Sequence, residues 1–379
     1  MTRLDPERKP PRRIVHCSSA HGANDSRILW RECRSLAESG DDVTIVAPAE
    51  EDVEIGGVAI RAIRPAESRF ERVTRTAWTV LWVARGLRGD VYHMHDPELL
   101  PLNWIVRRKG TVVIYDAHED LPRQVYHKPW IPSWARGLAR RLATLLLLVG
   151  SWMVDGVVAA TPHVAETFAD RLPIAVIHNF PRVSEFDPDQ RINSDPPLVV
   201  YVGVIAEARG AIEMVEAIDR VNSQLGVRLV LAGSITPTSL MPRLESMSGW
   251  SKTQFLGRID PHEIPRLLLS ARVGLVLLKD HPAYRQPYAT KMFEYMAAGM
   301  PFVASSLPAW RQQLEPWGCS LSVDPDDPEA IAEAIQWLLE HPHEADAMGR
   351  RGRDVVIANF SWETEEQNLL RFYSSLLTG

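Results

Sequence analysis

The chain has 379 residues, which predicts two domains of about 180 residues rather than one. Hydrophobic residues make up 45% of it and charged residues 24%, both ordinary for a soluble globular protein. The cysteines, Cys17, Cys33 and Cys319, are far apart and form no CxxC pair, so neither a disulfide framework nor a zinc site is predicted. This cysteine usage favours a reducing compartment.

The sequence offers no membrane-spanning candidate. Residues 1–13 are polar and do not look like a signal peptide. The longest apolar stretch, 142–154, is interrupted by polar residues and is too short to span a bilayer, so we predict a buried helix there. We therefore expect a cytoplasmic protein, whose membrane contact, if it has one, is peripheral at the inner face.

The charge of the chain is distributed unevenly. Residues 61–141 hold fifteen Lys and Arg against eight Asp and Glu, a net charge of +7, so the remainder carries −13 of the total of −6. A basic N-terminal half can face an anionic membrane or an anionic substrate. No recognisable nucleic-acid-binding motif accompanies the charge, and we predict no nucleic-acid partner.

The N-terminal half alternates strands and helices in the manner of a parallel α/β sheet. Its first loop lacks GxGxxG, so a nicotinamide fingerprint is absent. The predicted strands cover 12–18, 43–47, 58–63, 111–115, 155–160 and 175–181, with a further strand entering a helix at 90–98, and the first helix covers 26–39.

Polar residues follow the predicted strands at the points where the strands end, which is where doubly wound sheets bind ligands. Asp96 is expected to cap a helix that begins at Pro97. His93 and His95 alternate onto one strand face, but no third metal ligand is evident beside them, so core packing or site lining is favoured. The candidates at these strand ends are His21, Gly22, Asp25, His95, Asp96, His118, Glu119 and Asp120.

Residues 69–88 have helical periodicity with two distinct faces. The face predicted to join the core consists of Phe70, Val73, Ala77, Val80, Ala84 and Leu87. The other face carries Arg75, Trp78, Trp82 and Arg85, and is either an ordinary solvated edge or a stripe that lies at a membrane interface.

The strand–helix pattern restarts after a polar, Pro-rich segment at 182–197, which predicts a linker. Asp187-Pro-Asp189 and Asp324-Pro-Asp326 have the spacing of a metal-binding pair, but aspartates in such turns normally bond to the backbone, and we predict no metal site. The predicted strands are 198–203, 228–232, 255–259 and 273–278, with helices at 211–224 and 329–339.

Residues 288–305 predict a loop, a short helix, a tight exit and a buried strand. Thr290 is the expected N-cap, and Gly299 the left-handed end of the helix. Backbone N–H groups at the helix start, together with Lys291, form an anion site, most simply for phosphate. Glu294, one turn further on, can accept two ribose hydroxyls. The alternative is a capped surface helix in front of a core strand.

The segment Lys-Met-Phe-Glu-Tyr-Met-Ala-Ala-Gly at 291–299 resembles the donor-binding segment of the family 4 glycosyltransferases, which have the GT-B fold. The stretches 21–28 and 115–122 resemble the same sub-group. In the commoner form of the family two Glu residues stand eight positions apart. The second matches Glu294, but the first falls at Gln286, and Gln286, Tyr288 and Lys291 are candidates to replace it.

The resemblance implies two Rossmann-like domains that face each other across a cleft. The acceptor would bind the first domain and a nucleotide-diphosphate sugar the second. The family also carries an Arg after the first glycine of the second domain; here that position is Val204, and Arg209 remains. The implied organisation is a first domain at 1–181, a linker at 182–197, a second domain at 198–360 and a crossing-back helix at 361–379.

The family also implies roles for individual residues. His118 would sit beside the transferred sugar, and Arg209 and Lys291 would hold the diphosphate; we predict these three as catalytic. The predicted donor-binding residues are Gly22, Arg209, Gly257, Arg258, Gln286, Tyr288, Thr290, Lys291 and Glu294. The predicted acceptor-side residues are His21, Asp25, His95, Asp96 and Glu119.

The resemblance therefore implies a metal-independent glycosyltransferase that retains anomeric configuration and needs no cofactor besides its nucleotide-sugar donor. The acceptor would be a lipid-linked sugar, a polysaccharide or a small molecule. Two alternatives stay open at this point: a non-catalytic nucleotide-sugar-binding or scaffold subunit, and a sugar-nucleotide epimerase of the same fold.

Overall fold

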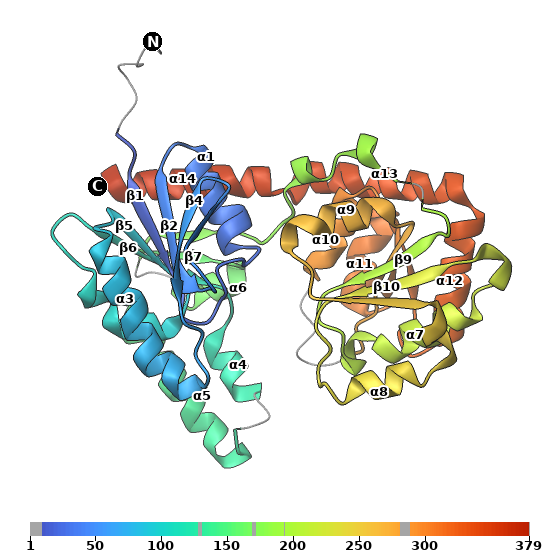
Figure 1. Ribbon diagram of the computed structural model, residues 1–379, viewed down its shortest axis with the longest axis horizontal. Helices are drawn as coiled ribbons and strands as arrows, with labels where there is room; N and C mark the ends of the chain where they lie inside the picture. Colours follow the sequence, from blue (N-terminus) through green and yellow to red (C-terminus); the bar gives the residue numbers. More distant parts are fainter. Residues whose placement is uncertain (1–9, 128–130, 169–171, 193, 281–288, 379) are drawn as a thin grey trace, which may run out of the picture. The chain divides into compact units, whose positions relative to one another are not determined.

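The computed structural model describes residues 10–127, 131–168, 172–192, 194–280 and 289–378. The chain divides into two compact units. The first consists of residues 1–179 and 364–379, and the second of residues 180–363. Each unit is built on its own largely parallel sheet with helices packed against it, which confirms the predicted α/β class (Figure 1).

The first sheet has eight strands in the order β3-β4-β2-β1-β5-β6-β7-β8. All neighbours pair in parallel except β3 and β4, which are antiparallel. The central strands are buried on both faces, which explains their nearly continuous runs of apolar residues. The strands are β1 Arg13–Cys17, β2 Asp42–Pro48, β3 Val53–Ile55, β4 Val58–Ile63, β5 Val91–Met94, β6 Val112–Ala117, β7 Gly156–Ala159 and β8 Ile174–Val176.

The helices of the first unit include several irregular turns. The π-helical turns are η1 Ile28–Cys33 and η2 Arg72–Thr76, and the 3₁₀ helix η3 spans Pro97–Ile105. The α-helices are α1 Arg34–Glu38, α2 Arg69–Glu71, α3 Ala77–Gly86, α4 Leu121–His127, α5 Ser133–Ser151 and α6 Pro162–Glu166.

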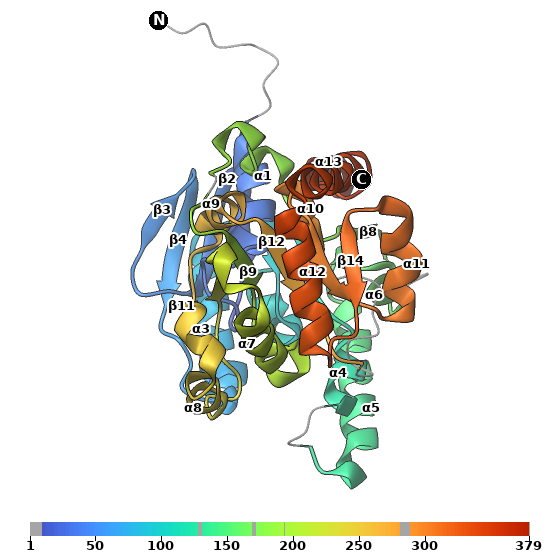
Figure 2. The same cartoon turned by 90° about the vertical axis from the view of Figure 1, so that its right-hand side faces the viewer.

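The second sheet has six parallel strands in the order β11-β10-β9-β12-β13-β14. Its alternate residues feed two apolar clusters, one with α7 and α12 and the other with α9 and α10 (Figure 2). The strands are β9 Leu198–Val202, β10 Arg228–Ala232, β11 Thr253–Gly257, β12 Val273–Val276, β13 Phe302–Ser305 and β14 Ser320–Val323.

The helices of the second unit surround its sheet. Short 3₁₀ turns lie at Val183–Glu185, Pro188–Gln190, Glu207–Arg209, Ser223–Leu225, Ser248–Lys252 and Pro261–Glu263. The α-helices are α7 Ala211–Arg220, α8 Leu240–Glu245, α9 Ile264–Ser270, α10 Thr290–Ala297, α11 Pro308–Trp317, α12 Pro328–Glu340 and α13 Pro342–Asn359, and α14 Trp362–Thr378 follows them.

The segment 182–197, predicted as a linker, packs on the second unit. Phe186 is buried in a core cluster of that unit. The Arg191 side chain donates to the carbonyl of Gly299 over 3.0 Å, and the Ile192 N–H donates to Leu269. The two Asp-x-Asp pairs form the expected turns, because Asp187 and Asp324 accept from the backbone N–H groups of Asp189 and Asp326.

Two predictions of burial are wrong. On the helical segment 69–86, Ala77, Val80 and Ala84 are buried as predicted, but Phe70 and Val73 are exposed. The stretch 142–154 was predicted as a buried helix, yet most leucines of α5 face solvent, since the helix contacts the rest of the first unit along one edge only. Within the described residues, no helix is long and apolar enough to cross a bilayer.

The final helix, α14, belongs mostly to the first unit. Tyr373 is fully buried there, and Phe372 nearly so. The helix approaches the sheet so closely that a Cβ on Gly156 would lie 2.8 Å from the Phe372 ring and 2.9 Å from Leu376. The first unit thus takes its closing helix from the opposite end of the sequence.

We expect Gly349→Ala to destabilise the second unit, because a Cβ there would lie 2.0 Å from the carbonyl oxygen of Gly299, just after α10. Overpacking of this kind typically costs about 1–3 kcal/mol. Gly137→Ala in α5 is the matched control: nothing lies within 4 Å of its added Cβ, and the exposed helix should gain about 0.4–1 kcal/mol. Denaturant unfolding measures both changes, and equal stability of the two variants would contradict the packing.

Candidate active site

A loop at the carboxyl end of β1 is held by one buried carboxylate. Asp96 Oδ2 accepts from Ser18 Oγ at 2.8 Å and from the N–H groups of Ser19 and Ala20 at 2.7 and 3.2 Å. The predicted capping role of Asp96 is therefore wrong: it precedes the helix at Pro97, but its side chain makes no cap there. The carboxylate instead shapes the loop that presents His21.

His21 lies between two carboxylates, with Nδ1 3.4 Å from Asp25 and Nε2 3.8 Å from Asp96. The hydrogen bond to Asp25, with help from the charge of Asp96, raises the pKa of His21 to about 9. His21 is therefore an imidazolium at neutral pH. The His21 ring stacks on the His118 ring with centroids 4.9 Å apart, so these two predicted site residues are in contact. Gly22 and Glu119 are exposed nearby in sequence.

Asp116, on β6, is the charged centre of this unit. Its Oδ2 lies 2.9 Å from His118 Nε2, 3.1 Å from His95 Nδ1 and 3.0 Å from Arg27 Nε. Burial acts to raise the pKa of Asp116, but Arg27 and His118 outweigh it, and the pKa lies well below its usual range. Because a carboxylate only accepts hydrogen bonds, the His118 Nε2 that faces Asp116 carries a proton, and Nδ1 is the ring nitrogen on the other side.

A chain of buried side chains continues inward from His95. His16 Nδ1 lies 2.8 Å from His95 Nε2, and the Tyr373 hydroxyl lies 2.7 Å from His93 Nδ1 and 3.5 Å from His16 Nε2. Burial lowers the pKa of all three histidines. The sequence did not reveal this chain, because its members come from β1, β5 and α14.

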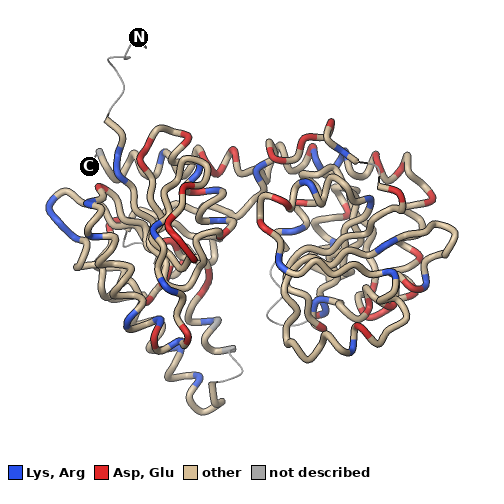
Figure 3. Tube along the Cα trace, in the orientation of Figure 1, with Lys and Arg blue, Asp and Glu red and all other residues tan. Residues whose placement is uncertain are grey.

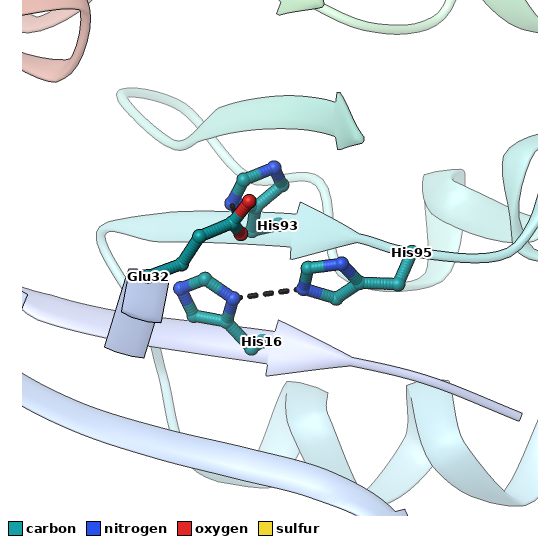
Figure 4. A group of neighbouring side chains, drawn as sticks. All are labelled: His16, Glu32, His93 and His95. Carbon is teal, nitrogen blue, oxygen red and sulfur yellow. Dashed lines mark hydrogen bonds and ion pairs between the residues drawn. The ribbon is translucent and has the colours of Figure 1, made fainter. Parts of the chain in front are cut away.

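His16, Glu32, His93 and His95 could in principle hold a metal ion, since their ligand atoms lie within 4.8 Å of one another (Figure 4). Sequence reasoning found no third ligand for His93 and His95, and the fold supplies two. However, the His16–His95 contact is a hydrogen bond, and Glu32 lies 3.0 Å from Arg27 Nε. Burial, then Asp116, raises the pKa of Glu32. Within the described residues, the two Glu32 carboxylate oxygens and His93 Nε2 have no hydrogen-bond partner, so hydrogen bonds link only part of this group.

Lys291 is the most deeply buried of the charged donor residues predicted in the second unit. This side chain is only 8% exposed, and its Nζ lies 3.2 Å from the Tyr201 hydroxyl and 4.4 Å from the centre of its ring. A Cβ on Gly203, which has a φ of +128°, would lie 3.2 Å from Nζ, so glycine is required there. Burial, reinforced by the charge of Arg209, lowers the pKa of Lys291 to about 7.

Arg209 and Glu294 are close enough to Lys291 for their charges to act on its pKa, Arg209 lowering it and Glu294 raising it. Arg209 ends a 3₁₀ turn, and Gly210 follows at a φ of +71°. A side chain at Gly210 would collide with Leu277, whose carbonyl oxygen lies 2.7 Å from the added Cβ. Both Arg209 and Glu294 are half-buried.

Thr290, Gly257 and Arg258 are the remaining donor predictions of the second unit that the structure describes. Thr290 is the first residue of α10 and not its N-cap, which is Ala289; no side chain caps this helix start. Gly257 adopts a φ of +66° and its carbonyl accepts from the Gly233 N–H, while Arg258 is exposed. The predicted Gln286 and Tyr288 lie outside the described residues.

Comparison with known proteins gives matches for both halves of the chain. Residues 26–182 match the model "Glycosyltransferase Family 4", and residues 183–355 match "Glycosyl transferases group 1". A glycogen synthase of Mycobacterium tuberculosis is 23% identical, with 97% of this chain and 91% of the relative covered. An MMP alpha-(1->4)-mannosyltransferase of Mycolicibacterium hassiacum is also 23% identical, over 78% and 73% of the two chains.

Solved structures resemble the whole chain. Sucrose-phosphate synthase from Thermosynechococcus elongatus has a TM-score of 0.71 at 20% identity, covering 97% of this chain and 99% of the other. Anabaena HepE in complex with UDP-glucose has a TM-score of 0.67 at 14% identity, covering 96% and 100%. The two parallel sheets and these matches define the fold as that of the GT-B glycosyltransferases.

The order of the two family matches along the chain indicates which type of GT-B glycosyltransferase this is. The first unit corresponds to the family 4 model and the second to the group 1 model, so the chain is a family 4-like glycosyltransferase. Both family models describe glycosyl transferases, which supports transfer of a glycosyl group as the chemistry.

Proposed function

We propose that the protein transfers a sugar from a nucleotide-diphosphate sugar to an acceptor with retention of anomeric configuration. The observation that carries this proposal is the buried Lys291, set beside Arg209 at the uncapped start of α10. A buried ammonium next to a second cation is costly unless an anion joins it. A diphosphate supplies that anion, and Glu294 accepts the ribose hydroxyls.

The proposed chemistry needs only the groups described. Departure of the nucleoside diphosphate places negative charge on its terminal phosphate, and Lys291, Arg209 and the α10 N–H groups stabilise that charge. The acceptor attacks from the face of the leaving group, and the phosphate takes its proton, so no carboxylate nucleophile is required. On the first unit, His118 contacts the transferred sugar or the acceptor through Nδ1, and His21, Asp25, His95, Asp96 and Glu119 form the acceptor side.

The donor proposal is supported by relatives. HepE is described in complex with UDP-glucose and with UDP, so uridine diphosphate is a suitable first probe. The acceptor is proposed to be a lipid-linked sugar, a polysaccharide or a small molecule. A thermal-shift screen against nucleoside diphosphates tests donor binding, since selective binding raises Tm by mass action. Release of nucleoside diphosphate from a panel of nucleotide sugars, with and without acceptors, then tests transfer.

One observation favours a second candidate. Val204 is an exposed apolar residue where the family carries a diphosphate-binding Arg, which fits a non-catalytic nucleotide-sugar-binding or scaffold subunit. Binding without turnover across a wide acceptor panel would support that role. Turnover of the nucleotide sugar without any acceptor would instead indicate a sugar-nucleotide epimerase of the same fold.

Activity is expected to survive EDTA, because Lys291 and Arg209 already offset the charge of the diphosphate. Initial rates measured before and after chelation, with magnesium or manganese added back, test this. Complete loss of activity that either metal restores would contradict the proposal of metal independence.

Affinity for a diphosphate is expected to fall as pH rises above 7. The ammonium of Lys291 binds the phosphates, and with a pKa of about 7 it loses its proton over this range. Each further pH unit should weaken binding by up to about tenfold. Calorimetry at pH 8 in buffers of different ionisation heats should show proton uptake. Lys291→Arg, which stays protonated, should flatten the profile, and an unchanged slope in that variant would contradict the assignment.

We also propose that the protein works in the cytoplasm in reversible contact with the inner membrane face. A stripe that lies at a membrane interface must be exposed, and Trp78 and Trp82 of α3 are exposed. Trp78 also packs edge to face against the exposed Trp104, with ring centroids 6.0 Å apart. Binding to anionic vesicles that falls with added salt supports this contact. Equal partitioning onto neutral and anionic vesicles would remove it.

A further inference from the structure

The helix α5 presents an apolar face to solvent. It extends away from the sheet of the first unit, with α4 beside it (Figures 1 and 2). Its inner edge is anchored through Ala143, Leu147 and Gly150, and a Cβ on Gly150 would lie 2.7 Å from Leu100. The opposite side exposes Trp134 (83%), Leu138 (57%), Leu142 (57%), Leu145 (53%), Val149 (49%) and Trp152 (81%).

These six exposed residues form one continuous stripe. Their spacing of three or four positions places them on a single side of an α-helix, over the full length of α5 and one residue beyond. A contiguous apolar patch of this extent marks a surface that another body covers. Tryptophan at both ends is the arrangement favoured at a membrane interface, where the ring is amphipathic.

A hollow of about 510 Å³ opens next to the stripe, between α4 and α5. Tyr126 lines it from α4, and Arg140, Arg141, Leu145 and Leu148 line it from α5. Among the described residues, no carboxylate pairs with Arg140 or Arg141, so the hollow joins two uncompensated cations to an apolar wall. A group that carries an anionic phosphate on an alkyl body matches this lining.

The charge of residues 121–154 indicates what kind of partner binds to the stripe and the hollow. From residue 121 to residue 154 the sequence has five Lys and Arg and no Asp or Glu. Figure 3 shows the basic colour and no acidic colour along α5. A second copy of the chain would set these cations against their own equivalents, which is repulsive. An anionic lipid surface complements both the cations and the apolar stripe.

We propose that the α4–α5 pair docks onto an anionic bilayer. The stripe lies in the boundary between headgroups and acyl chains, and the hollow at Arg140 and Arg141 receives a lipid phosphate. This surface is separate from the tryptophans of α3, and the proposal goes beyond sugar transfer, because it holds whether or not the chain is catalytic.

The test uses co-sedimentation of the full-length protein with phosphatidylcholine vesicles, with and without phosphatidylglycerol. Arg140→Gln/Arg141→Gln should lower the partition coefficient onto anionic vesicles by about thirtyfold, at about a tenfold change per 1.4 kcal/mol. Leu138→Ser/Leu142→Ser/Val149→Ser should lower it by at least about tenfold. The matched control, Arg266→Gln/Arg350→Gln, removes two exposed arginines of the second unit and should bind as wild type.

Other outcomes overturn the proposal. If the arginine and stripe variants keep wild-type binding, or if all variants including the control lose it equally, α4–α5 is not the lipid-binding surface. If the wild type is a concentration-dependent dimer by light scattering, and the stripe variant is a monomer while binding vesicles normally, the occupant is a second copy. Trp78→Ser/Trp82→Ser measures how much of the vesicle binding is due to α3. The affinity of each variant for a nucleoside diphosphate shows whether the proposed sugar transfer is affected independently of lipid binding.

Discussion

Lys291→Ala should weaken the binding of a nucleoside diphosphate by roughly ten- to a hundredfold, with little effect on the binding of the nucleoside alone. The ammonium is buried beside Tyr201 and Arg209, so its bonds to phosphate oxygens would form in a poorly solvated place. Charge-assisted hydrogen bonds of this kind contribute about 1.5–3 kcal/mol each. Arg209→Ala should show the same selectivity.

The controls for this prediction lie in the same unit. Glu294→Ala should weaken the binding of the nucleoside diphosphate and of the nucleoside equally, because Glu294 is proposed to bind the ribose. Lys252→Ala removes a lysine that pairs with Asp219 at 3.5 Å and should bind as wild type. Calorimetry measures all four variants. If Arg209, Lys291 and Glu294 variants all bind like wild type while folded, the donor lies elsewhere and the proposed function loses its physical support.

His118→Ala should lower kcat by about a hundredfold or more, while changing the affinity for nucleoside diphosphate little. His118 lies at the end of β6, where Asp116 fixes its Nε2–H and leaves Nδ1 to meet a substrate hydroxyl. His163→Ala is the matched control, because that half-exposed histidine pairs with Asp120 at 3.3 Å and should keep full activity. Steady-state rates and calorimetry together separate kcat from binding, and an unchanged kcat would give His118 a structural role.

A companion variant tests how His118 is held. Asp116→Asn keeps the shape of the side chain but removes the charge that fixes the tautomer of His118. The ¹⁵N shifts of the His118 ring report that tautomer independently of activity. Because Arg27 also loses its partner, an unfolding curve must accompany the measurement. Asp116→Asn with the wild-type tautomer and wild-type kcat would show that Asp116 serves only Arg27.

The α/β class and most central strands could be predicted, because buried parallel strands leave long apolar runs between turn residues. Lys291 and Glu294 could be predicted to lie together because they are three positions apart on one helix. Arg209 needed the resemblance, since its segment is far away in sequence. His16 and Tyr373 could not be found, because only the sheet order and the last helix bring them to His93.

The α5 helix shows a limit of hydrophobic patterns. Leu147 lies on its buried edge, and Leu142 and Leu145 lie on the exposed side, but the sequence marks all three as apolar. A helix that is apolar nearly all round predicts burial, and no local signal states which side has a partner. Phe70 lies at the start of its helical segment and is exposed, although it shares a face with the buried Ala77 and Val80.

Contacts between residues far apart in the sequence also overrode a local helix-capping preference. Asp96 occupies the position before a helix that favours a capping aspartate, but the N–H groups of Ser19 and Ala20 take its carboxylate. Those donors are more than seventy positions away and become neighbours only because β1 and β5 pair. Short-range capping preferences cannot anticipate such competition.

The position of α14 in the sequence determines the order in which the two units can be completed during translation. The first unit is translated early, but the helix that carries Phe372 and Tyr373 is translated only after residues 180–363. Until α14 has been synthesised, the nascent first unit lacks the hydroxyl that meets His93, and the apolar surface around Gly156 stays uncovered. Residues 180–363 form an uninterrupted unit and can fold as soon as they emerge. The N-terminal unit is thus completed after the second unit, although its synthesis begins first.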